Sequence, residues 1–164
     1  MKAARSAGVD IFRVFDGLND THNLEIGIRA AIAAEAMAEE AILDTGDILD
    51  PTYKYTLDYY MDVVDQVVSF GSHIISSRSM SGVLKPPVGD ILVRSIRGRY
   101  HHIPIHMHSH DNDDTAIATM VAYAAAGADI INTAIDSISG TTSQPALSSV
   151  MGALESTGYD VEFD

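Results

Sequence analysis

The chain has 164 residues, 46% of them hydrophobic, no cysteine and a formal net charge of −13, which predicts one domain with a substantial core and no disulfides. The acidic balance argues against a nucleic-acid partner and against binding to an anionic membrane surface. Because no stretch approaches the roughly 20 apolar residues of a membrane span, we expect no membrane partner and a soluble, intracellular protein.

Short apolar and β-branched segments alternate along the chain with segments whose apolar residues recur at helical spacing. Strands are predicted over residues 10–15, 41–44, 73–77, 103–112 and 128–134. Helices are predicted from 23 to about 37, from 57 to just before 71, through 91 and 96, from 112 or 113 to 127, and from about 145 to 156.

The predicted strands begin about 30 residues apart, the length of one strand-plus-helix unit, which predicts a parallel sheet. An open doubly wound sheet and part of an eight-stranded α/β barrel both fit this pattern. Polar residues follow the strands at their carboxyl ends, where barrel enzymes collect their chemistry, and we find no glycine-rich phosphate loop. A complete barrel needs about 250 residues. We therefore predict a partial TIM (β/α)8 barrel of five βα units, a single domain over residues 1–164.

Three histidines share one face of the fourth predicted strand. His106, His108 and His110 are spaced by two residues, and side chains alternate faces along a strand. Neutral imidazoles gathered at a strand end can bind a divalent transition metal. A hydrogen-bonded polar layer at the mouth of the barrel is the alternative.

Arg13 is the one basic residue within an apolar strand. Burial of its charge would require an anionic partner. We expect a structural aspartate, with a substrate carboxylate as the alternative.

Several motifs, in this order and spacing, resemble the carboxyltransferase domain of the biotin-dependent pyruvate carboxylase family. The fourth strand contributes Pro104-Ile-His-Met-His-Ser-His-Asp111. The other motifs lie at 9–20, 45–51, 54–60, 80–86 and 136–145. The resemblance extends over essentially the whole chain and implies that the five strands are strands four to eight of the family's barrel.

The resemblance implies transfer of a carboxyl group from carboxybiotin to pyruvate, which yields oxaloacetate for gluconeogenesis. Biotin and ATP would be bound by other domains of a full-length protein, which we expect to be a homo-oligomer. A divalent metal, Zn or Mn, would be bound by His108 and His110. The resemblance assigns no catalytic or substrate-binding residue to this chain: Arg13 does not inherit the role of the family's pyruvate-binding arginine, and the family's proton-shuttling threonine would lie beyond Asp164.

The chain departs from the family pattern around this site. Arg78 occupies the position of a carbamylated lysine that binds the metal, and a guanidinium stays protonated and cannot form a carbamate. The first-strand aspartate ligand is missing as well. Glu40 and Asp44 replace a small and an aromatic residue. These changes predict impaired chemistry.

Two alternatives to an impaired carboxyltransferase segment stay open. One is a metal-dependent aldol-type lyase or synthase of the same barrel superfamily. The other is a non-catalytic remnant that acts as a packing module. For the compartment, we expect the cytoplasm, with the mitochondrial matrix as the alternative.

Overall fold

The computed structural model describes residues 1–45, 47–82 and 84–159. Gly46 and Val83, which belong to two of the motifs, lie outside the described residues. The strands are β1 (Ile11–Val14), β2 (Met37–Asp44), β3 (Ile74–Ser79), β4 (Ile105–Ser109) and β5 (Ile130–Ile131). The helices are α1 (Lys2–Ser6), α2 (Thr21–Ile32), α3 (Leu57–Ser69), α4 (Pro86–Arg99), α5 (Ala116–Ala126) and α6 (Leu147–Leu154), with a 3-10 turn at Asp136–Ile138.

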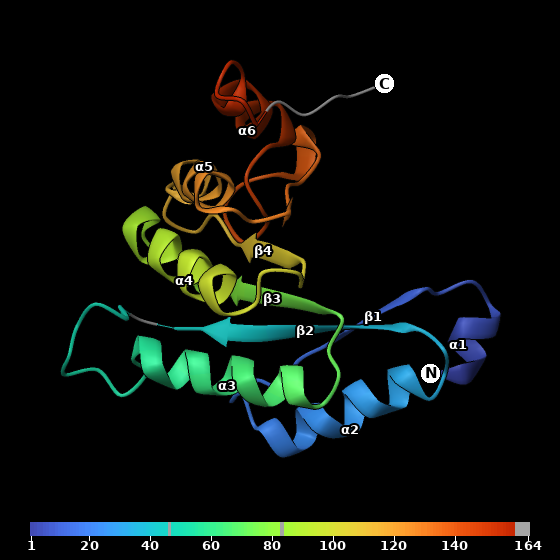
Figure 1. Ribbon diagram of the computed structural model, residues 1–164. Coiled ribbons are helices and arrows are strands. Elements are labelled where there is room, and N and C mark those ends of the chain that lie inside the picture. The colour runs from blue at the N-terminus through green and yellow to red at the C-terminus, as the bar shows by residue number, and fades with distance from the viewer. Residues whose placement is uncertain (46, 83, 160–164) are drawn as a thin grey trace.

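The five strands form one parallel sheet in the order β1-β2-β3-β4-β5. A helix connects each of the first four strands to the next, and α2 to α5 lie along one face of the curved sheet (Figure 1). This sequential order is that of an arc of a (β/α)8 barrel, so the predicted five-unit partial barrel is confirmed. In the part of the chain that the structure describes, no helix is long and apolar enough to cross a membrane.

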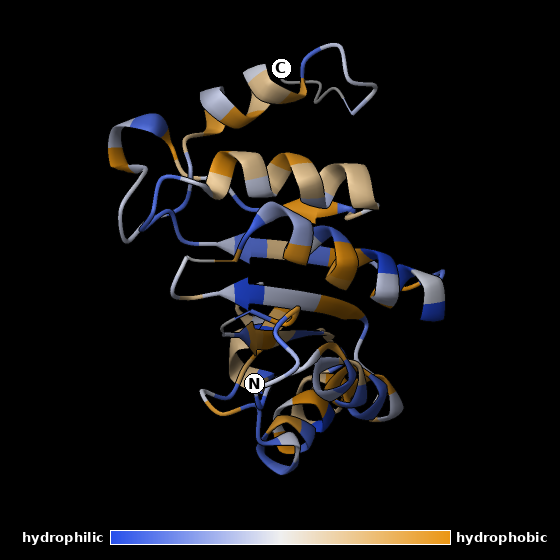
Figure 2. Cartoon of the chain, turned by 90° about the vertical axis from the view of Figure 1, so that its left-hand side faces the viewer, coloured by the Kyte–Doolittle hydropathy of each residue, from blue (hydrophilic) through white to orange (hydrophobic). Residues whose placement is uncertain are grey.

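The core lies between the sheet and its helices. The side chains that form it, from the outer face of the sheet and from the helices, are mostly apolar and almost fully buried, among them Ile28, Val64, Val67, Ile75, Val93, Ile105, Met107 and Met120. Positions two residues apart share a face, so the opposite, inner face carries Arg13, Glu39 and Arg78 together with the histidines of β4. In Figure 2 the arrowheads of two neighbouring strands are blue, which marks the polar carboxyl ends of the sheet.

The predicted helix from residue 23 to about residue 37 is wrong at its carboxyl end. Helix α2 ends at Ile32, and β2 begins at Met37, which pairs with Ile11. Between them Glu35 takes a left-handed conformation with φ 57°, which a continuing helix cannot contain. The alanine-rich sequence favours helix locally, but pairing with β1 converts residues 37–40 to strand. Consequently β2 starts four residues earlier than predicted.

The amino-terminal helix α1 was not predicted, and β5 is shorter than its predicted strand. Only Ile130 and Ile131 of residues 128–134 form strand. Next to them, Asp129 turns its carboxylate toward β4, where Oδ2 accepts a 2.7 Å hydrogen bond from the Ile105 amide. The Asp129 side chain therefore adds a hydrogen bond to β4 beside the two backbone pairs between β4 and β5.

Two carboxyl groups are buried between the sheet and the helices. Glu40 is 0% exposed, and neither of its carboxyl oxygens has a hydrogen-bond partner among the described residues. Burial, with a smaller effect of the nearby Asp16 charge, raises the pKa of Glu40 to about 8. Asp44 accepts a 2.5 Å hydrogen bond from Ser77 Oγ, and burial raises its pKa to about 6. Burial therefore shifts both groups toward the protonated form relative to the unfolded chain, and at pH 7 Glu40 is mainly protonated.

We expect Glu40→Met to stabilise the fold at neutral and alkaline pH. In the unfolded chain Glu40 ionises near its ordinary pKa of 4.5, whereas in the fold it ionises near 8. Its contribution is therefore intact below pH 4.5 and is lost as the pH rises toward 8, by about 3 kcal/mol at pH 7. Urea unfolding at pH 5 and pH 8 measures this. The gain should be larger at pH 8, and the exposed-site variant Glu155→Gln should show no such difference. A gain that does not depend on pH would contradict the assignment.

Candidate functional site

The inner face of the sheet carries two connected polar groups, one deep between the strands and one at their carboxyl ends. Strand register places Arg13 beside Glu39 and Arg78 beside His108. Because the strands are parallel, their carboxyl ends meet at one edge of the sheet. The parallel topology therefore brings polar side chains together at this edge, as predicted.

The deep group consists of Arg13, Glu39 and His106. Glu39 Oε1 lies 2.6 Å from Arg13 Nε and 3.0 Å from His106 Nδ1, and Arg13 Nη2 lies 3.1 Å from the same histidine nitrogen. Burial by itself would raise the pKa of Glu39, but hydrogen bonds and charge from His106 and Arg13 lower it. The predicted aspartate partner of Arg13 is wrong: the partner is a glutamate from the neighbouring strand.

His108 lies between Asn132 and Arg78. Its Nδ1 is 3.0 Å from Asn132 Oδ1, and its Nε2 is 3.4 Å from Arg78 Nη2. An amide oxygen only accepts and a guanidinium only donates, so Nδ1 carries the proton and the Nε2 lone pair faces Arg78. Burial, and to a smaller extent the positive charge of Arg78, lower the pKa of His108 to about 4, against the opposing effect of the hydrogen bond that His108 donates to Asn132. The imidazole is therefore neutral at pH 7.

His110 completes the upper group. Its ring centroid lies 5.2 Å from that of His108, with the two planes at 70°. Its Nδ1 is 2.6 Å from the Thr142 carbonyl oxygen. This oxygen accepts, so Nδ1 donates, and the lone pair of the neutral ring resides on Nε2. The structure thus brings His108 and His110 together, whereas His106 belongs to the deep group.

Arg78 is the third member of the upper group. Its guanidinium carbon lies 5.4 Å from the centre of the Phe15 ring, a distance at which an aromatic face attracts a cation. Its Nε is buried without a hydrogen-bond partner among the described residues. Burial, followed by repulsion from Arg13, lowers the pKa of Arg78. The guanidinium nevertheless stays charged at neutral pH.

The residues present do not fit a divalent cation while Arg78 holds this position. A structural or catalytic zinc needs three or four protein donors, and no group of three or more His, Cys, Asp or Glu ligands occurs within residues 1–45, 47–82 and 84–159. The Nε2 lone pair of His108 already faces a positive charge. Metal binding by His108 and His110 stays a prediction, and Arg78 is the feature that opposes it.

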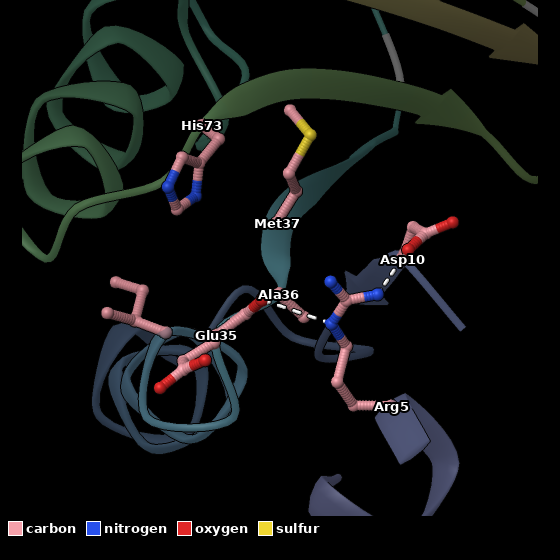
Figure 3. A pocket seen from close by; sticks show the side chains of 7 residues that line it. Arg5, Asp10, Glu35, Ala36, Met37 and His73 are labelled. Carbon is pink, nitrogen blue, oxygen red and sulfur yellow. Dashed lines mark hydrogen bonds and ion pairs between the residues drawn. The ribbon is translucent and has the colours of Figure 1, made fainter. Parts of the chain in front are cut away.

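Two of the hollows on the described part of the chain lie away from this edge and are lined by charged residues. One, of about 400 Å³, lies at the amino-terminal end of the strands, where Arg5 forms an ion pair with Asp10 and a 3.1 Å hydrogen bond to the Glu35 carbonyl oxygen (Figure 3). Its arginine is thus already compensated. The other, of about 390 Å³, lies over the deep group and is lined by Arg13, Glu39 and His106 with three isoleucines. The inner face is therefore concave beside the deep group.

A family model described as HMGL-like matches residues 2–164. The chain belongs to the HMGL-like family. Within this family the chain is similar to pyruvate carboxylases: it is 50% identical over 159 residues to pyruvate carboxylase of Aspergillus niger and 41% identical over 162 residues to mitochondrial pyruvate carboxylase of Rattus norvegicus. These alignments cover 97% and 98% of this HMGL-like chain but 13% and 14% of the relatives. The chain thus spans a small part of their length.

Solved structures place the similarity in one domain. The carboxyl transferase domain of Rhizobium etli pyruvate carboxylase matches with a TM-score of 0.95 and 38% identity, over 99% of this HMGL-like chain and 27% of that chain. The same domain solved with pyruvate and biocytin matches equally well, over 28% of its chain. The resemblance to a pyruvate carboxylase carboxyltransferase domain is therefore confirmed.

Sequence reasoning missed two residues of the site. Glu39 lies just beyond the alanine-rich segment that was predicted to be helical, outside the predicted strand, so its pairing with Arg13 was not visible. Asn132 lies in the predicted fifth strand. It also comes within 3.5 Å of Arg13 through Nη1, so it joins the two groups. Asn132 is two residues after Ile130, so the two side chains lie on the same, inner face of the sheet. A polar residue at this position was the signal that could have identified Asn132.

We expect Arg78→Lys to raise the affinity of His108 and His110 for Zn²⁺ by about tenfold or more, because the guanidinium no longer faces the Nε2 lone pair. Added hydrogencarbonate should increase the effect, since a lysine amine, unlike a guanidinium, can form a carbamate. Titration calorimetry with Zn²⁺ measures both. Arg94→Lys, which changes an exposed arginine paired with Asp90, is the matched control. Equal affinity in the parent chain and Arg78→Lys would refute the role given to Arg78.

Proposed function

We propose that the chain is a segment of a pyruvate carboxylase-type carboxyltransferase domain in which carboxyl transfer is impaired. The reaction class is supported by the 41% to 50% identity to pyruvate carboxylases and by the shared fold. The impairment is supported by one contact, the 3.4 Å separation of Arg78 Nη2 and His108 Nε2. This contact places a permanent positive charge beside His108, the imidazole that would bind the metal according to the family resemblance.

In the proposed reaction carboxybiotin, carried on another domain, releases carbon dioxide, and the biotin ring takes up a proton. Pyruvate loses a proton from its methyl group, and the resulting enolate carbon attacks carbon dioxide. The new carbon–carbon bond gives oxaloacetate. A group that lowers the negative charge on the enolate oxygen would accelerate the step.

The described residues of the inner face position and compensate one another's charges. The pair of Arg13 with Glu39, bridged to His106, keeps charged side chains compensated on the inner face. Asn132 holds His108 through Nδ1 and so fixes which nitrogen faces Arg78. We assign none of them a proton-transfer role. Pyruvate and carboxybiotin are the proposed partners, and the cytoplasm is the proposed compartment, with the mitochondrial matrix as the alternative that the name of the rat relative raises.

A non-catalytic packing module is the second candidate. The sheet has β1 and β5 at its edges, and both expose apolar side chains: Ile11 is 46%, Phe15 57% and Ile130 40% exposed. Parallel edges with exposed apolar residues favour association with further polypeptide. The aldol-type lyase has less support, because the relatives reported above are pyruvate carboxylases.

A carboxylation assay tests the proposal. Oxaloacetate formed from pyruvate and a carboxybiotin donor is measured with the 164-residue chain, and the Rhizobium etli carboxyl transferase domain serves as the positive control. We expect turnover at least about a hundredfold below the control, since loss of a metal-supporting position has effects of this order. Turnover near that of the control would sink the proposed impairment. Cleavage of an acyl-CoA substrate would instead support the lyase, and absence of any turnover would favour the packing module.

A further inference from the structure

Arg78 differs from every other arginine of the chain in its counter-charge. Arg5, Arg13, Arg29, Arg94, Arg97 and Arg99 each form an ion pair with a carboxylate. Arg78 has no such pair among the described residues, where its contacts are the His108 imidazole and the Phe15 ring. A partly buried guanidinium without a carboxylate retains unused hydrogen-bond donors and an uncompensated charge.

The surroundings of Arg78 leave this charge uncancelled. The charged groups that influence it are Arg13 and Glu39, and the Glu39 carboxylate is already bonded to Arg13 and His106. His108 meets Arg78 through a ring nitrogen and supplies no carboxylate. Among the described residues the Arg78 guanidinium therefore lacks a carboxylate partner, although the chain as a whole carries −13. Salt screens the remote acidic residues, since the Debye length is about 8 Å at physiological ionic strength.

A hydrogen-bond acceptor lies next to these donors. His110 donates from Nδ1 to the Thr142 carbonyl oxygen, so Nε2 is the ring nitrogen that can accept a hydrogen bond. The rings of His108 and His110 are 5.2 Å apart, and His108 itself contacts Arg78. The guanidinium and His110 thus both lie beside the His108 ring. The edge of the sheet combines a cationic donor with a ring nitrogen that can accept a hydrogen bond.

We infer that the carboxyl end of the sheet, at Arg78 and His110, binds a small oxyanion that also carries a hydroxyl hydrogen, the chemical class of hydrogencarbonate. Two oxygens of the anion accept hydrogen bonds from the planar guanidinium, which matches carboxylate geometry. The hydroxyl donates to His110 Nε2. This inference requires no metal and no carboxyl transfer, so it goes beyond the proposed function and its failure is distinguishable from the failure of that function.

The test is a ¹H–¹⁵N chemical-shift titration of the 164-residue chain at pH 8. Sodium hydrogencarbonate is compared with sodium acetate, which has the charge without the hydroxyl, and sodium chloride keeps the ionic strength constant. We expect saturable shifts at residues 78–79, 108–111 and 141–143 with a millimolar Kd for hydrogencarbonate. Binding of acetate should be at least about tenfold weaker, the cost of leaving a polar partner unpaired.

Three variants sharpen the test. Arg78→Gln should weaken hydrogencarbonate binding by at least about tenfold, the effect expected for a charge-assisted hydrogen bond. Arg94→Gln, at an exposed arginine of α4, should leave it unchanged. His110→Phe should reduce the affinity for hydrogencarbonate to that for acetate.

Three results would overturn the inference. They are shifts that do not saturate, hydrogencarbonate binding that persists unchanged in Arg78→Gln, and equal binding of acetate and hydrogencarbonate by the parent chain. If Arg78→Gln loses the dispersed spectrum of a folded protein, Arg78→Met takes its place. Methionine keeps an apolar stem but has neither the charge nor the planar fork of arginine, so weaker binding supports the inference and unchanged binding overturns it.

Discussion

The register between β3 and β4 is the constraint on which the polar edge of the molecule depends. It aligns Arg78 with His108 on the inner face of the sheet, and a shift of β4 by one residue would turn His108 into the core. The apolar residues on the other face, such as Ile75 and Met107, are almost fully buried and hold this register. Packing on one face thus determines which charges meet on the other.

The contact between Arg78 and His108 determines which groups carry charge on the inner face. Burial, together with this permanent cation, keeps the imidazole neutral, and the neutral imidazole cannot offset the cation in return. One level deeper, Arg13 meets a cation's usual partner, the carboxylate of Glu39. The same residue type is therefore compensated at one level and uncompensated at the next. This difference underlies both the proposed loss of carboxyl transfer and the inferred anion site.

The sequence predicted those features that follow from local pattern. The alternation of His106, His108 and His110 placed them on one face, and the spacing of strand-plus-helix units predicted the parallel sheet. The family motifs singled out Arg78 as an altered position. The missing parts depend on tertiary pairing: β2 extends into an alanine-rich segment only because β1 pairs with it. For the same reason, Glu39 as the partner of Arg13 was not predictable from pattern alone, whereas the shared face of Ile130 and Asn132 was a signal for Asn132.

The most direct test of the central claim is the hydrogen bonding of the His108 ring, observed by ¹⁵N NMR of the chain with labelled histidine. The account predicts a neutral ring at pH 7 with its proton on Nδ1 and an Nε2 shifted by a hydrogen bond from Arg78. Addition of Zn²⁺ should leave this nitrogen unchanged, whereas the shift should disappear in Arg78→Gln. A proton on Nε2, or an Nε2 resonance that moves with stoichiometric Zn²⁺ in the parent chain, would contradict the account.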